Sequence, residues 1–66
     1  MMITLNGERT DVPGRPTVLD VITARGLADK PVAVEVNKQL VPRKQHATHV
    51  LDEGDVVELV TFVGGG

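Results

Sequence analysis

The sequence predicts a small α+β domain in which one helix packs on one face of a mixed, five-stranded sheet. Five short segments have the pattern of strands, and one amphipathic segment lies between the second and third of these strands. The length of 66 residues is that of a single domain. A single helix with one apolar stripe buries that stripe most economically against one sheet face. We therefore expect the order β-β-α-β-β-β, with residues 1–63 as the domain and residues 64–66 as a flexible glycine tail.

The first two strands are predicted to form a β-hairpin. Strand patterns cover residues 2–5 and 8–12, and Asn6-Gly7 joins them. Asn-Gly is typical of a type I′ turn, because both central residues of that turn take positive φ. Pro13 then interrupts the second strand, since proline cannot donate to a strand ladder.

A short helix follows, and Thr17 is its predicted N-cap. The Thr17 hydroxyl can accept a backbone N–H of the first turn, and Asp20 occupies the reciprocal position of a capping box. Gly26 is placed as the glycine that ends the helix. The apolar stripe, at i, i+3 and i+4, consists of Val18, Val21 and Ile22.

Three further strands are predicted in the second half of the chain. Residues 32–36 alternate strictly, and a turn leads to a short strand at residues 40–41. Residues 43–49 are polar and are expected to be irregular, and residues 52–55 form an acidic turn. Residues 56–63 are apolar at nearly every position, which favours a central strand. The predicted core consists of Ile3, Leu5, Val18, Val21, Val32, Val34, Val36, Leu51, Val57 and Leu59.

Composition excludes several classes of function. Cysteine is absent, so a disulfide framework, a thiolate zinc site and a cysteine nucleophile are impossible. Phe62 is the only aromatic residue and the formal net charge is −2, which argues against nucleic acid and anionic lipid as partners. The apolar runs are too short to span a membrane, and the first residues lack a signal-peptide pattern, so we expect a cytoplasmic protein.

No group of side chains forms a recognisable catalytic or metal-binding pattern. His46 and His49 are three residues apart but lack further ligands, so we expect two surface histidines and no metal site. The threonines lack an adjacent base, and the acidic turn lacks the ligand spacing of a calcium loop. We therefore expect no catalytic residue in this chain.

The glycine tail is the one feature that the fold does not need. Glycines have no Cβ to block entry into a narrow cleft, and three residues extend over about 10 Å. A terminal carboxylate is unreactive until it is activated, for example as an acyl-adenylate. The tail of Gly64, Gly65 and Gly66 is thus interpreted as a handle on which another enzyme acts. The alternative is a frayed terminus or an expression scar.

Several segments of the chain resemble the ThiS family of sulfur carriers. They are AVEVN at residues 33–37, VPR at 41–43, LDEGDVVE at 51–58 and FVGGG at 62–66, and the resemblance covers essentially the whole chain. It implies a ubiquitin-like β-grasp fold. Residues 37–58 alone also resemble TGS domains, which share that fold, but the terminal Gly-Gly favours a carrier.

The resemblance also implies a function and a set of partners. A ThiF-like enzyme would use ATP and magnesium to adenylate the Gly66 carboxylate, and sulfur from a cysteine desulfurase persulfide would then replace AMP. A ThiG-like thiazole synthase would take the sulfur of the resulting thiocarboxylate into the thiazole of thiamin. The carrier would be a protein co-substrate rather than an enzyme, would bind no cofactor itself, and is expected to be a monomer when free.

Three other functions are compatible with the same sequence. A MoaD-like carrier would hand its sulfur to a molybdopterin precursor, and a ubiquitin-like modifier would join its C-terminus to lysines or serve tRNA thiolation. A TGS-like module would bind a partner without covalent chemistry. Deletion of Gly66 separates the last function from the others, because only a covalent carrier needs that carboxylate.

The alternation of the last strand predicts a docking surface for partner enzymes. If Val57 and Leu59 point into the core, the residues between and after them point outward, beside Ala33 and Glu35. An exposed apolar patch next to the tail is typical of an interaction site. The alternative is that the phenylalanine folds over the sheet edge. The predicted surface has Val60 and Phe62 at its centre, with Glu58 and the acidic turn of residues 52–55 as its polar rim.

Overall fold

Five strands and one α-helix make up the fold of the computed structural model, which describes residues 1–62. In chain order the elements are β1 (Met2–Leu5), β2 (Glu8–Asp11), α1 (Val18–Ala24), β3 (Val32–Val36), β4 (Gln39–Val41), the 3₁₀ helix η1 (Arg43–Gln45) and β5 (Val56–Thr61). The strand order is β2-β1-β5-β3-β4, so the most apolar strand is central, as predicted. The pair β1–β5 is parallel and the other pairs are antiparallel, which makes the sheet mixed.

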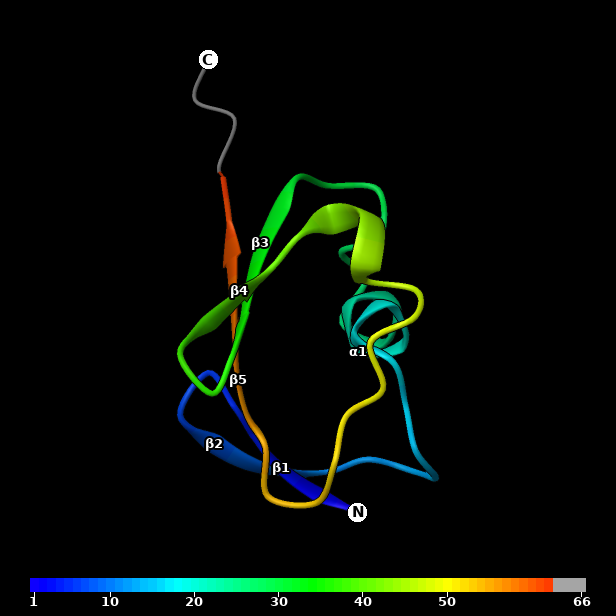
Figure 1. The fold of residues 1–66 in the computed structure, drawn as a ribbon, viewed down its shortest axis with the longest axis vertical. Helices are drawn as coiled ribbons and strands as arrows, with labels where there is room; N and C mark the ends of the chain where they lie inside the picture. Colours follow the sequence, from blue (N-terminus) through cyan, green and yellow to red (C-terminus); the bar gives the residue numbers. More distant parts are fainter. Residues whose placement is uncertain (63–66) are drawn as a thin grey trace.

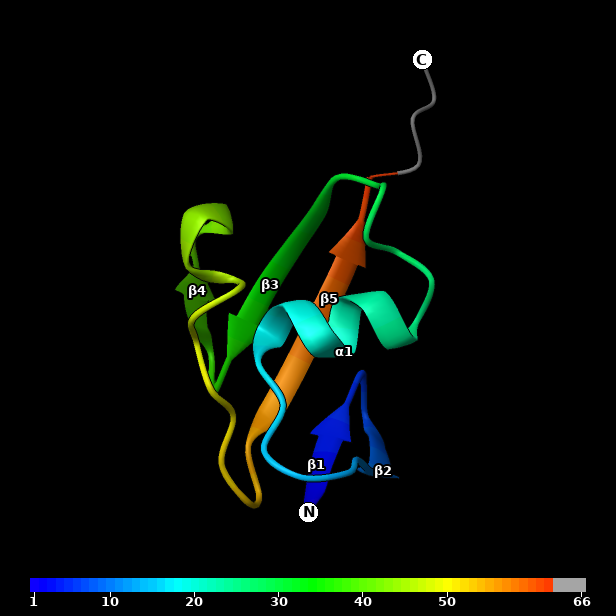
Figure 2. The ribbon, with the colours of Figure 1, turned by 90° about the vertical axis from the view of Figure 1, so that its right-hand side faces the viewer.

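The sheet and α1 form two layers. Figure 1 shows α1 nearly end-on beside the sheet, and Figure 2 shows the helix crossing in front of the strands, with β5 in the middle. Among residues 1–62, no element covers the opposite face of the sheet. The predicted α+β class with one helix on one face is therefore confirmed. No helix in this part of the chain has the length and apolar character needed to cross a membrane.

The core lies between α1 and the sheet, in the register that alternation predicts. Val34 is fully buried and Leu59 is 8% exposed, so neither strand is slipped by one residue. Val32, which was predicted in the core, is only half-buried and packs against it. Ile22 and Val41, which were not in the predicted core, are buried in it. The buried apolar residues are Ile3, Leu5, Val18, Val21, Ile22, Val34, Val36, Val41, Leu51, Val57 and Leu59.

The predicted capping box is present at the start of α1. The hydroxyl of Thr17 accepts the N–H of Asp20 at 3.1 Å, and a carboxylate oxygen of Asp20 accepts the N–H of Thr17 at 2.9 Å. Gly26 follows the helix with a φ of +72°, which explains the glycine at this position. Since a helix of seven residues is marginal alone, these caps and its buried face hold it in place.

Two asparagines tie the hairpins to the central strand. Asn6, in the β1–β2 turn, and Asn37, in the β3–β4 turn, both have positive φ. The side-chain oxygen of Asn6 accepts the N–H of Leu59 at 2.8 Å, and that of Asn37 accepts the N–H of Val56 at 3.0 Å. Each turn therefore provides a bond that helps to fix β5 between the two hairpins.

Residues 43–49 differ most from the sequence prediction. They contain η1 rather than an irregular segment, and His46 is buried at 7% exposure while His49 is half-buried. The ring Nε2 of His46 donates to the carbonyl of Val41 at 3.0 Å, and its backbone carbonyl accepts the N–H of Leu19 at 2.8 Å. The prediction of two surface histidines was wrong for His46, because these bonds make burial of a polar ring acceptable.

Candidate functional site

The outer face of β5 presents the residues that alternation predicts. Val57 and Leu59 are buried under α1, whereas Glu58 and Val60 between and beyond them are exposed. Val60 is 55% exposed, and Phe62, just past the strand, is 60% exposed. The only aromatic side chain of the sequence thus lies outside the core.

The neighbouring strands extend this outer face. Ala33 lies opposite Val60 in the β3–β5 pair, and Glu35 lies opposite Glu58. On its other side Glu35 pairs with Leu40 of β4, which is 69% exposed. The uncovered face of the sheet therefore combines apolar side chains with two carboxylates.

The chain leaves the sheet from the end of β5. The N–H of Phe62 donates to the carbonyl of Pro31 at 3.4 Å, so the backbone still pairs with its neighbour one residue past the strand. The predicted last strand ended at Val63, which lies outside the described residues, as do Gly64, Gly65 and Gly66. The expected mobility of the glycine tail stays a prediction.

The acidic turn of residues 52–55 does not belong to the same part of the surface. It precedes β5 whereas Phe62 follows it, and six strand residues span roughly 20 Å. Its carboxylates also have partners within the fold. Asp52 accepts from the guanidinium of Arg15 at 2.8 Å, and Asp55 accepts from the amide of Asn37 at 3.0 Å. Of the polar residues predicted around Val60 and Phe62, only Glu58 therefore lies on the same part of the sheet face. Glu35, which the prediction placed beside this surface, is its neighbour.

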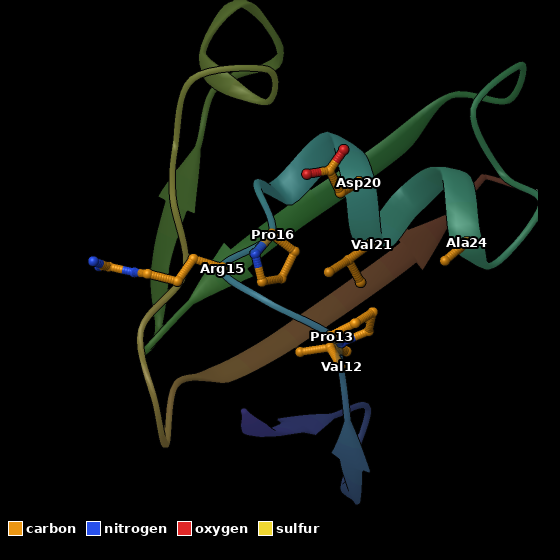
Figure 3. Close-up of a pocket in the computed structure, with 7 residues that line it drawn as sticks. All are labelled: Val12, Pro13, Arg15, Pro16, Asp20, Val21 and Ala24. Atoms are coloured by element: carbon orange, nitrogen blue, oxygen red, sulfur yellow. The ribbon is translucent and has the colours of Figure 1, made fainter.

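A groove of about 330 Å³ lies on the other side of the molecule, beside α1 (Figure 3). Its walls are mainly apolar, and its charged members are Arg15 and Asp20. The Asp20 carboxylate caps α1. Figure 3 shows Arg15 reaching away from the apolar side chains, and its guanidinium donates to Asp52. The lining residues are Val12, Pro13, Arg15, Pro16, Asp20, Val21 and Ala24. Within residues 1–62, no three His, Cys, Asp or Glu side chains are grouped to hold a metal ion.

Comparison with known proteins connects this chain to a family. A family model described as the ThiS family matches residues 3–66. The sulfur carrier protein ThiS of Bacillus subtilis is 37% identical over 68 residues, which cover 98% of this chain and 100% of the relative. A thiazole synthase of Paramagnetospirillum magneticum is 35% identical over 66 residues, which are all of this chain but 20% of the relative. The chain thus spans about a fifth of the length of that thiazole synthase.

A solved structure has the same architecture. The crystal structure of a thiamine biosynthesis protein (ThiS) from Geobacter metallireducens superposes with a TM-score of 0.82 at 32% identity, and the match covers 100% of both chains. This likeness and the strand order confirm the predicted ubiquitin-like β-grasp fold. Because the family model matches nearly every residue and a sulfur carrier is matched along its full length, the chain belongs to the ThiS family.

Proposed function

We propose that this chain is a sulfur carrier of thiamin biosynthesis and that it holds sulfur as a thiocarboxylate on Gly66. The observation that supports this function is the match to the Bacillus subtilis sulfur carrier, which extends over the full length of that relative. The family model also includes the terminal glycines in its match. The chain then acts as a protein co-substrate, in the cytoplasm, and the reactions are catalysed by its partners.

The chemistry begins with activation of a poor electrophile. An oxygen of the Gly66 carboxylate attacks the α-phosphorus of ATP on a ThiF-like enzyme, and pyrophosphate leaves with the help of magnesium. The terminal sulfur of a persulfide, formed by a cysteine desulfurase, then attacks the acyl carbon and displaces AMP. A thiol reduces the resulting acyl disulfide, which leaves a thiocarboxylate on the carrier and a disulfide on the donor.

A thiazole synthase is the proposed acceptor of this sulfur. The match between this chain and a segment of the Paramagnetospirillum magneticum thiazole synthase supports a functional link between the carrier fold and that enzyme class. Gly64 and Gly65 would pass through a narrow entrance to bring Gly66 to the reacting centre, because neither has a side chain.

The proposed docking surface consists of Glu58, Val60 and Phe62. These residues are exposed, lie on or just past β5, and come within six positions of Gly64 in the sequence. Exposed apolar groups at such a place favour contact with a partner over contact with water. A partner that binds here would hold the strand from which the tail begins.

Reconstitution of sulfur transfer tests the proposed function. The thiocarboxylated chain is mixed in parallel with a thiazole synthase and its substrates, and with the large subunit and precursor of molybdopterin synthesis. We expect thiazole product in the first reaction and none in the second. Product only in the second reaction would assign the chain to the other pathway, and product in neither would reject a carrier role in both.

A further inference from the structure

Two carboxylates face each other at the centre of the uncovered sheet face. Glu35 of β3 and Glu58 of β5 are directly paired in an antiparallel ladder, and both are exposed. Side chains paired in this way have Cβ atoms about 4.5–5.5 Å apart, and like charges at that spacing destabilise the strand pair. The fold therefore contains a like-charged pair that its own stability does not favour.

Within the described part of the chain, no ion pair involves either carboxylate. The ion pairs found among residues 1–62 join the N-terminus to Asp11 and Arg15 to Asp52, and neither involves Glu35 or Glu58. Exposed apolar side chains of the same face lie beside the two carboxylates. Val60 is 55% exposed, and Val56 and Leu40 are 42% and 69% exposed.

A partner that covers the apolar neighbours also removes water from the two carboxylates. Burial of an uncompensated charge is strongly unfavourable, and two adjacent charges of one sign make it more so. A guanidinium or ammonium group from the partner would reverse this, because it would neutralise the repulsion and bond to both carboxylates. The arrangement is therefore complementary to an apolar surface that contains a cation.

We propose that Glu35 and Glu58 form a carboxylate pair that receives an arginine or lysine side chain of the thiazole synthase. The inference rests on the proposed function, which makes that enzyme class the acceptor of sulfur. It adds that binding is specified by charge at the centre of the docking surface as well as by apolar contact. The pair would improve recognition at the expense of the stability of the free carrier.

Removal of either charge should weaken binding to the thiazole synthase without lowering the stability of the free chain. Glu35→Gln, Glu58→Gln and the double variant are titrated with thiazole synthase by calorimetry, and each is unfolded with urea. We expect each single change to weaken binding roughly 5- to 30-fold, with a larger effect in the double variant. The urea midpoint should stay the same or rise, because the repulsion within the strand pair has been removed. A matched control is Glu8→Gln, an exposed glutamate on the edge strand β2, which should bind as the original chain does.

Salt dependence separates charge from shape. The difference between the original chain and the double variant should be largest at low salt and should fall as the salt rises to about 1 M, but it should not vanish, because charge pairs buried in an interface are screened much less than exposed ones. Equal binding by all variants at low salt, while the original chain binds the synthase and donates sulfur, would overturn the inference and leave the proposed function intact. Weakened binding to the activating enzyme alone would also overturn it. If the original chain fails to bind the synthase, the proposed function itself fails.

Discussion

Phe62 and Leu59 lie three positions apart in the sequence but in opposite environments. Leu59 is 8% exposed and packs under α1, whereas Phe62 is 60% exposed. We expect Leu59→Ala to lower the free energy of unfolding by about 2–5 kcal/mol, because it leaves a cavity in the core. Phe62→Ala should have a smaller effect on stability but weaken binding to the activating enzyme or the thiazole synthase by about 1–3 kcal/mol.

Urea unfolding and calorimetric titration of the two variants measure these effects separately. The Leu59→Ala variant serves as the control for a loss of stability without a change in the docking surface. If Phe62→Ala unfolds the domain and leaves binding unchanged, Phe62 belongs to the core and the proposed docking surface is wrong.

Asn6 has a structural role that its turn propensity does not reveal. Asn6→Gly keeps the positive φ of the turn but removes the oxygen that accepts the Leu59 N–H. We expect a loss of about 1–2 kcal/mol, because a partly buried donor in the central strand loses its partner. Faster hydrogen exchange of the Leu59 amide by NMR should accompany the loss.

Lys38→Gly is the matched control for this change. Lys38 also has positive φ in a tight turn, but the structure gives its side chain no hydrogen bond to β5. Glycine relieves the strain of that backbone conformation, so stability should be kept or raised. Equal losses in the Asn6 and Lys38 variants would show that turn conformation alone is responsible.

The helix α1 depends on its cap because it has only seven residues. Thr17→Ala removes the hydroxyl that accepts the Asp20 N–H, and we expect a loss of about 1 kcal/mol in the free energy of unfolding. Thr17→Ser keeps the hydroxyl and should retain most of the stability. Chemical unfolding monitored by circular dichroism measures both variants, and equal stability of all three chains would refute the role of the capping box.

The elements with strong local signals were predictable from the sequence. The Asn6-Gly7 pair specifies the first hairpin, and the capping box specifies the start of α1. The burial of His46 was not predictable, because the Val41 carbonyl that accepts its ring N–H is brought near only by tertiary folding. Residues 43–49 are polar and lack periodicity, so no pattern indicated η1.

The sequence predicted which side chains of β5 point outward, but not which residues of β3 lie opposite them. Alternation along β5 places Val60 outward, and this is confirmed by its exposure. That Glu35 lies opposite Glu58 depends on how β3 and β5 are aligned, which alternation within one strand does not specify. By contrast, the separation of the acidic turn from Phe62, at opposite ends of β5, follows from the predicted strand itself.

The fold gives β5 two roles at once. Its inward side chains form the centre of the core, and its outward side chains form the centre of the uncovered sheet face. Because β5 ends at Thr61, three positions before Gly64, a partner bound to its outer face would hold the chain close to the proposed reactive group. Under the proposed function, this arrangement would let a partner position the chain for chemistry that the partner catalyses.

The thiocarboxylate on Gly66 is the proposal on which the function depends, and mass spectrometry can test it. The purified chain is incubated with the activating enzyme, ATP, magnesium and a persulfide source, and the intact protein is then weighed and fragmented. We predict a mass gain equal to the replacement of one oxygen by one sulfur, located on Gly66 and dependent on ATP. A chain lacking Gly66 should keep its circular dichroism spectrum but gain no sulfur. Sulfur on another residue, or normal thiocarboxylate formation in the Gly66 deletion, would contradict the proposed carrier chemistry.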